Sequence, residues 1–159
     1  MAPNLFASEM VLIVTGALLF YVAYNDLRHY KIRNELIIAL AVLFIIHAVV
    51  SGRWVGAQWN VAFAALMFVA MLLLYARRLM GGGDVKLLGV AFLWVGLDCA
   101  LPFAVLLLAF AGMHALAVRL GWAEVKRASN DARPRIPFAP SIAAALIGVF
   151  MLGCLAPRP

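Results

Sequence analysis

The sequence contains, at residues 57–76, the uncharged stretch AQWNVAFAALMFVAMLLLYA, which is followed directly by Arg77 and Arg78. Twenty residues of α-helix extend about 30 Å, which is the thickness of the hydrocarbon core of a bilayer. This stretch therefore predicts a transmembrane helix that ends at a charged membrane surface. Because lipid offers no partner to an unpaired backbone group, the other apolar stretches of the chain are expected to be helical as well.

The composition of the whole chain points to the same class of protein. Of the 159 residues, 67% are hydrophobic and 13% are charged, and the mean hydropathy is +1.02. Soluble domains are about 45–50% apolar and about 25% charged. We therefore exclude a water-soluble globule and predict an all-α, polytopic membrane protein that forms one domain over residues 1–159.

Polar interruptions divide the chain into six apolar segments, which we predict to be six transmembrane helices. These segments are Leu5–Tyr24, Asn34–Val50, Ala57–Ala76, Val85–Leu97, Cys99–Val118 and Pro140–Ala156. No Lys or Arg precedes the first segment, so we expect it to be retained as a helix and not removed as a signal peptide.

The positively charged residues fall in alternate connections between these segments. Apart from Arg53 and Arg158, every Lys and Arg lies in or beside the first, third or fifth connection. By the positive-inside rule these connections face the cytosol, and the N-terminus and the C-terminus face outward. Topology thus accounts for the net charge of +6, and we expect contacts with anionic lipids but no nucleic-acid partner.

Other residues that often carry chemistry give no site in this sequence. Cys99 and Cys154 lack C-x-x-C spacing, and we predict neither a zinc site nor a disulfide framework. His47 and His114 are expected to pack between helices, and Gly112 is expected to lie on a helix-packing surface. We expect no metal and no cofactor.

Two aspartates are exceptional because both are expected at the cytosolic side of the membrane. Asp26 follows the first apolar segment, and Asp84 follows the glycines at positions 81–83. The fourth segment would extend only about 20 Å before Asp98, so Asp84 should lie below the membrane surface, facing a water-filled cleft. The glycines before it are expected to be non-helical backbone, which membrane proteins tolerate beside such a cleft.

Two carboxylates placed close together cannot both ionise readily, so one keeps a proton while the other can deprotonate a water. This pattern predicts an aspartic protease with Asp26 and Asp84 as its catalytic pair. Glycines lack a Cβ and reach positive φ, so they would let an extended substrate come close. The plain alternative is that Asp26 is an interfacial charge beside Arg28 and that Asp84 caps its helix.

Three stretches carry a resemblance to one family. They are Asp26-Leu27-Arg28-His29-Tyr30-Lys31-Ile32-Arg33-Asn34, Gly81-Gly82-Gly83-Asp84-Val85-Lys86-Leu87-Leu88 and Ile136-Pro137-Phe138-Ala139-Pro140. They resemble, in order, the first-aspartate segment, the GxGD-V-K-L segment and the I-P-F-x-P segment of the type IV prepilin peptidases, the GxGD aspartic proteases of bacterial inner membranes. Arg33 stands where that family usually has proline.

The resemblance implies an endopeptidase of the bacterial inner (cytoplasmic) membrane that cuts a prepilin or pseudopilin. It would remove the short basic leader at the cytosolic face, next to a glycine that precedes the hydrophobic helix of the substrate. In size the chain is similar to the short enzymes of tight-adherence (Flp-type) pilus and secretion systems, which have no methyltransferase domain.

Further residues are expected to shape this site or to bind the substrate. They are Gly81, Gly82, Gly83, Lys86 and Glu35. Glu35, together with Glu124 and Asp131, would offer negative charge to a basic leader.

Two other functions use a similar pair of acids. A GxGD protease of the presenilin-like kind cuts ordinary transmembrane helices, although it typically pairs its GxGD element with a Y-D motif that this chain lacks. A small proton- or ion-coupled transporter would use intramembrane carboxylates as a relay, and it would leave its substrate intact.

Overall fold

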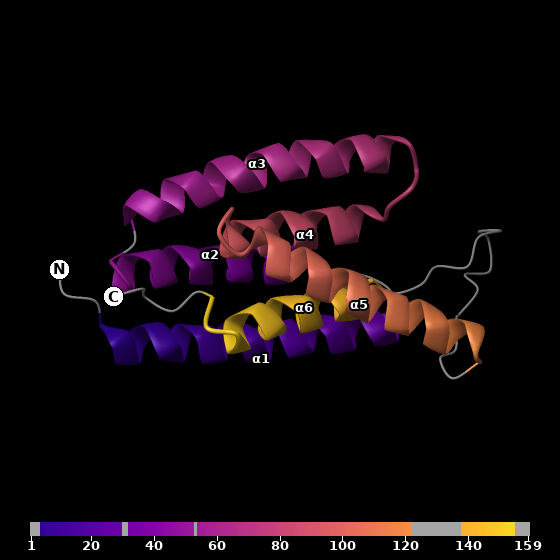
Figure 1. Ribbon diagram of the computed structural model, residues 1–159, viewed down its shortest axis with the longest axis horizontal. Helices are drawn as coiled ribbons and strands as arrows, with labels where there is room; N and C mark the ends of the chain where they lie inside the picture. The colour runs from indigo at the N-terminus through magenta and orange to yellow at the C-terminus, as the bar shows by residue number, and fades with distance from the viewer. Residues whose placement is uncertain (1–3, 30–31, 53, 122–137, 155–159) are drawn as a thin grey trace.

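The computed structural model describes residues 4–29, 32–52, 54–121 and 138–154, in which six α-helices form a bundle (Figure 1). The helices are α1 (Leu5–His29), α2 (Asn34–Val50), α3 (Trp54–Ala76), α4 (Gly82–Val95), α5 (Ala100–Arg119) and α6 (Ala139–Met151). These ranges contain no strand, so the predicted all-α fold and its six helices are confirmed.

The helices differ in whether they can cross a bilayer alone. Helix α1, residues Gly56–Ala76 of α3, and helix α5 are long and apolar enough, whereas α2 and α6 are apolar but shorter. Helix α4 has 14 residues, which corresponds to about 21 Å. The chain is therefore a multi-pass membrane protein, while six complete crossings and the orientation of the termini stay predictions.

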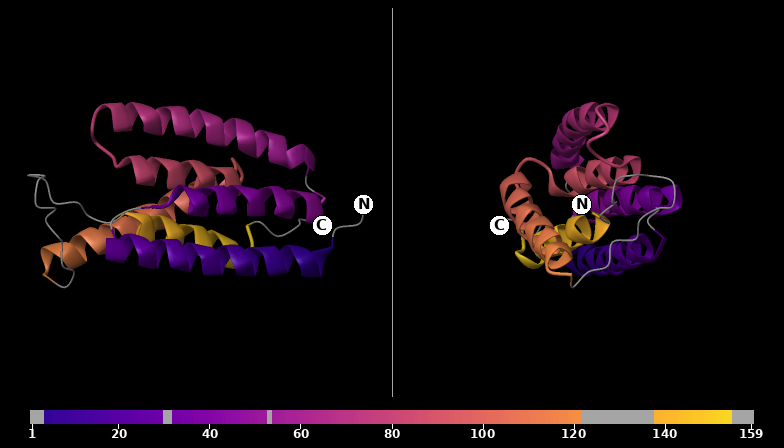
Figure 2. Two further views of the ribbon diagram at one scale, coloured as in Figure 1. Left: turned by 180° about the vertical axis from the view of Figure 1, so that it is seen from behind. Right: turned by 90° about the vertical axis from the view of Figure 1, so that its right-hand side faces the viewer.

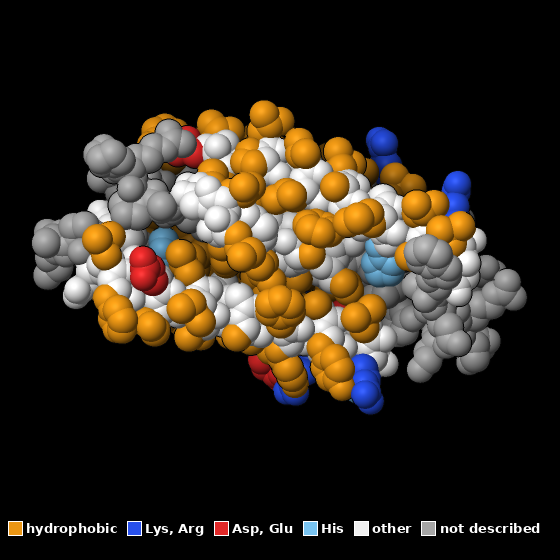
Figure 3. Space-filling model, turned by 60° about the horizontal axis from the view of Figure 1, so that its bottom comes forward, with side chains coloured by type: hydrophobic (Ala, Val, Ile, Leu, Met, Phe, Trp, Pro, Cys, Tyr) orange, Lys and Arg blue, Asp and Glu red, His pale blue; other side chains and the backbone are white. Residues whose placement is uncertain are grey.

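The two short helices α4 and α6 form the centre of the bundle. Helix α6 packs against α1, α4 and α5, and α4 packs against α2, α3, α5 and α6. Figure 2 shows α3 at the edge of the bundle beside α4. Many large apolar side chains are exposed, and those on the face drawn in Figure 3 lie along the length of the bundle, which suits contact with lipid.

Trp94 joins three helices in the core. It is 1% exposed, and its indole Nε1–H donates a hydrogen bond of 3.1 Å to the backbone carbonyl of Leu40 in α2. The rings of Phe44, His47 and Phe150 lie with their centroids 5.7, 5.4 and 5.4 Å from the Trp94 ring. Trp94 therefore fixes α4 against α2 and α6, and His47 packs between helices as predicted.

Replacing Trp94 by Ala is expected to lower the free energy of unfolding by about 3 kcal/mol, because the cavity forfeits these packing contacts. Trp94→Phe keeps most of the ring packing and should cost about 1 kcal/mol through the lost hydrogen bond. Unfolding of the detergent-solubilised protein measures both values. Equal stability of Trp94→Ala and wild type would contradict this role.

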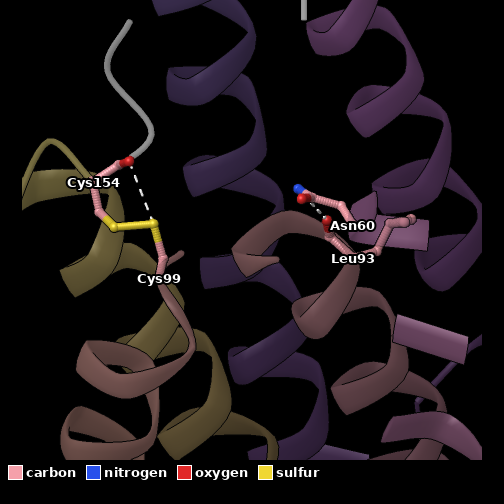
Figure 4. The surroundings of a disulfide bond; sticks show 4 residues. All are labelled: Asn60, Leu93, Cys99 and Cys154. Carbon is pink, nitrogen blue, oxygen red and sulfur yellow. Dashed lines mark hydrogen bonds between the residues drawn. A yellow bond between two sulfur atoms is a disulfide. The ribbon is translucent and has the colours of Figure 1, made fainter. Parts of the chain in front are cut away.

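A disulfide bond joins Cys99 to Cys154, with the Cα atoms 6.1 Å apart (Figure 4). Cys99 is the N-cap of α5, and Cys154 lies just after the end of α6. The prediction of no disulfide framework was wrong, because spacing along the chain does not reveal that these two helix ends meet. Close by, the Asn60 side chain of α3 donates a hydrogen bond of 3.2 Å to the carbonyl of Leu93.

Candidate active site

The C-terminal end of α1 and the N-terminal ends of α2, α4 and α6 lie toward the same end of the bundle (Figure 1). Asp26 lies in the last turn of α1, and Asp84 lies in the first turn of α4. The fold thus brings to one end of the molecule two acids that are far apart in the sequence.

Asp26 is buried, with 5% of its surface exposed. The backbone N–H of Ala139 donates a hydrogen bond to its carboxylate, and His114 of α5 is close enough for an imidazolium charge to attract it. The other carboxylate oxygen, Oδ2, is buried and has no hydrogen-bond partner among the described residues. Arg28 instead lies over the ring of Tyr24, 5.2 Å from its centroid. Asp26 is therefore not the exposed interfacial charge of the plain alternative.

Asp84 is half-buried, and its charge is repelled by the charge of Asp26. Its carboxylate folds back toward Gly81, where an added Cβ would lie 2.9 Å from the Asp84 Oδ2 atom. No side chain caps the N-terminus of α4 through a hydrogen bond. Asp84 therefore does not cap α4 through a side-chain hydrogen bond, as the plain alternative expected.

The three glycines differ from the expected conformation. Gly82 and Gly83 are the first residues of α4, and only Gly81 precedes it, with extended φ −73° and ψ 143°. None of the three has positive φ, so the prediction of non-helical backbone at positive φ was wrong for this segment. A hydrogen bond of 3.1 Å from the Val85 N–H to the Gly81 carbonyl closes the first helical turn instead.

Close packing explains why small residues suit this turn. A Cβ at Gly82 would lie 3.3 Å from Cε2 of Tyr75, and a Cβ at Gly83 would lie 3.4 Å from Cδ1 of Ile32. The start of α4 therefore sits tightly between the end of α3 and the residues that lead into α2.

Lys86 and Glu35 both lie exposed near the start of α2. The Lys86 ammonium donates a hydrogen bond of 3.0 Å to Oδ1 of Asn34, which links the first turns of α4 and α2. Glu35 forms an ion pair of 2.6 Å with Arg33, the residue that stands in the usual proline position. An exposed ion pair contributes at most about 1 kcal/mol, so Glu35 can exchange Arg33 for another cation.

Several predicted residues fall outside the described residues. They are Glu124, Asp131, Ile136 and Pro137. Among the residues that the structure does describe, no group of three or more His, Cys, Asp or Glu side chains could hold a metal ion.

Two groups near Asp26 were missed by the sequence analysis. His114 was predicted only to pack between helices, and the backbone N–H of Ala139 has no signature as a functional group. The I-P-F-x-P resemblance marked the right segment, since Ala139 belongs to it. Neither the hydrogen bond nor the charge interaction could be inferred without knowing that the start of α6 packs on α1 and that His114 of α5 lies within reach of the Asp26 charge.

Fold and site together define a helical membrane protein with two interacting acids, one of them buried, at one end of its bundle. A model of the type IV leader peptidase family matches residues 13–156, and the chain belongs to this family. It is therefore a protease of the type IV leader peptidase kind, as the three motifs indicated. Comparisons with curated proteins and with solved structures gave no match.

Proposed function

We propose that this chain is a single-domain aspartic endopeptidase of the GxGD type that removes the short basic leader of a prepilin or pseudopilin at the cytosolic membrane face. The observation that carries the proposal is that buried Asp26 and half-buried Asp84 lie at one end of the bundle in a member of the type IV leader peptidase family. Two such acids can divide the roles of general base and general acid.

The proposed reaction uses water as the nucleophile. The ionised aspartate takes a proton from water while the oxygen attacks the scissile carbonyl carbon, and the protonated aspartate gives its proton to the carbonyl oxygen. The resulting diol then returns a proton to the second aspartate as the C–N bond breaks, and the first aspartate protonates the leaving nitrogen. Both acids are thereby restored to their starting states, and the reaction needs no metal or covalent intermediate.

The disulfide supports the predicted orientation in the inner membrane. Disulfide bonds persist in oxidising compartments such as the bacterial periplasm. Asp84 lies in the first turn of α4, and Cys99 comes shortly after the last residue of the same helix. The acid and the disulfide therefore lie toward opposite ends of α4. With the disulfide in the periplasm, the acids lie toward the cytosol, in agreement with Arg77 and Arg78 shortly before Asp84.

Recognition of a basic leader requires negative charge on a face that is otherwise basic. Glu35 is exposed beside the start of α2, and its weak ion pair with Arg33 leaves it able to bind a leader Lys or Arg. Anionic lipid would hold the leader near the same surface.

Processing of a purified Flp-type prepilin tests the proposed function. The wild-type protein in lipid nanodiscs is expected to release the leader by one cut next to the glycine before the hydrophobic helix, which mass spectrometry of both products locates. A matched prepilin in which the leader Lys and Arg residues are replaced by Gln should be cut more slowly. Intact prepilin after incubation, together with ion flux in proteoliposomes, would instead support the transporter.

A further inference from the structure

The start of α6 makes a direct contact with Asp26. Ala139 is the first residue of α6, and its backbone N–H donates a hydrogen bond to the Asp26 carboxylate. The two groups are shielded from solvent, since Ala139 is 0% and Asp26 is 5% exposed. A charge-assisted hydrogen bond between buried groups is strong and fixes orientation.

The N-terminus of α6 has no cap from its own N-cap residue. Phe138, the N-cap of α6, provides no side-chain cap, and Pro140 has no N–H of its own. The N–H groups of Ser141 and Ile142 are directed to the Phe138 carbonyl. An acid from another helix, Asp26, therefore satisfies one of the first N–H groups of α6, which have no partner within the helix.

The opposite end of α6 is held by the disulfide. Cys154 lies 15 positions after Ala139, which corresponds to about 22 Å in a helix. Its bond to Cys99 ties the end of α6 to the turn between α4 and α5. Along the way Gly148 packs closely on Leu106 of α5, where an added Cβ would lie 2.9 Å from Cδ1. The axial position of α6, and with it the position of Ala139, is thereby constrained.

We propose that the backbone N–H of Ala139 is a positioning group for Asp26 and that the Cys99–Cys154 disulfide holds this group in place. The inference rests on the proposed function, in which Asp26 is one of the two acids. The hydrogen bond fixes the carboxylate in one orientation, while its other oxygen, Oδ2, is buried and has no hydrogen-bond partner among the described residues. The disulfide acts on the rate of cleavage from the far end of α6.

Two substitutions at one position test the hydrogen bond. Ala139→Pro removes the N–H at the first helical position, where proline is common, but it also disfavours the αR backbone of Phe138; Ala139→Gly keeps the N–H. We expect kcat of prepilin cleavage to fall about 10- to 100-fold in Ala139→Pro, with KM within about twofold of wild type. Ala139→Gly should keep kcat within about threefold of wild type. Equal kcat values for the two folded variants would overturn the inference.

A double-mutant cycle tests the link to the disulfide and separates positioning from general stabilisation. Replacing Cys99 and Cys154 by Ser is expected to lower kcat about 3- to 10-fold, and to have little further effect in the Ala139→Pro background. If the two changes lower kcat independently, so that their fold-losses multiply in the combined variant, the link between the disulfide and Ala139 is overturned. If Ala139→Pro does not fold, the variant with both cysteines replaced by Ser tests the link alone. An unchanged kcat in that variant overturns the link.

The same measurements distinguish this inference from the proposed function. If the wild-type protein cleaves prepilin and the two variants Ala139→Pro and Ala139→Gly have the same kcat, only the inference about Ala139 is wrong. Wild-type protein that cleaves no prepilin removes the proposed function itself.

Discussion

Asp84→Asn is expected to lower the rate of leader cleavage by at least about a thousandfold, and Asp26→Asn should have a similar effect. Asparagine keeps the shape of aspartate, but its amide can neither take a proton from water nor donate one as an acid. Because the two acids act as one unit, the double variant should be little slower than either single variant. Single-turnover cleavage of a purified prepilin measures all three rates.

Asp98→Asn is the matched control for this loss. Asp98 is exposed and lies in the turn after α4, at the end opposite to Asp84. The same chemical change there should leave the rate within about twofold of wild type, as is usual for a surface substitution. Normal cleavage by a folded Asp26→Asn or Asp84→Asn variant would remove the aspartic mechanism.

Gly81→Ala is expected to lower kcat about 100-fold while the protein keeps its stability. The added Cβ would lie 2.9 Å from Oδ2 of Asp84, so the carboxylate must move. The backbone at Gly81 is extended, with φ −73° and ψ 143°, so alanine brings no conformational strain. A shift of about 1 Å in a reacting group can cost about a hundredfold in rate.

Gly112→Ala provides a glycine control in α5. A Cβ at Gly112 would meet nothing within 4 Å, so this residue is not on the helix-packing surface that the sequence predicted. Helical alanine in open space should leave the cleavage rate unchanged and raise stability slightly. Wild-type kcat in Gly81→Ala, measured beside this control, would show that the carboxylate position near Gly81 is not required for cleavage.

The sequence predicted the helices better than their ends. The bounds of α2, Asn34–Val50, agree with the prediction, because polar residues flank this apolar segment. Helix α1 continues to His29, past the predicted end at Tyr24, because a helix can extend beyond its apolar part. Helix α4 begins at Gly82, since glycines adopt helical dihedrals when the backbone hydrogen bonds are made.

The two acids could be singled out as candidates from the sequence because charge near an apolar segment is rare and costly. Their surroundings could not. The hydrogen bond from Ala139 to Asp26, the charge interaction of His114 with Asp26, and the bond between Cys99 and Cys154 involve helices that are distant in sequence. Hydropathy and charge predict the order of the helices and their direction in the membrane, but they do not say which helix ends pack together.

The separation of the two carboxylates tests the central claim most directly. An experimental structure of the enzyme in lipid, at a resolution that shows ordered water, is expected to place the nearest oxygens of Asp26 and Asp84 within about 6 Å, bridged by one water. Carboxylates that face different surroundings, too far apart for one water to contact both in any conformer, would contradict the account.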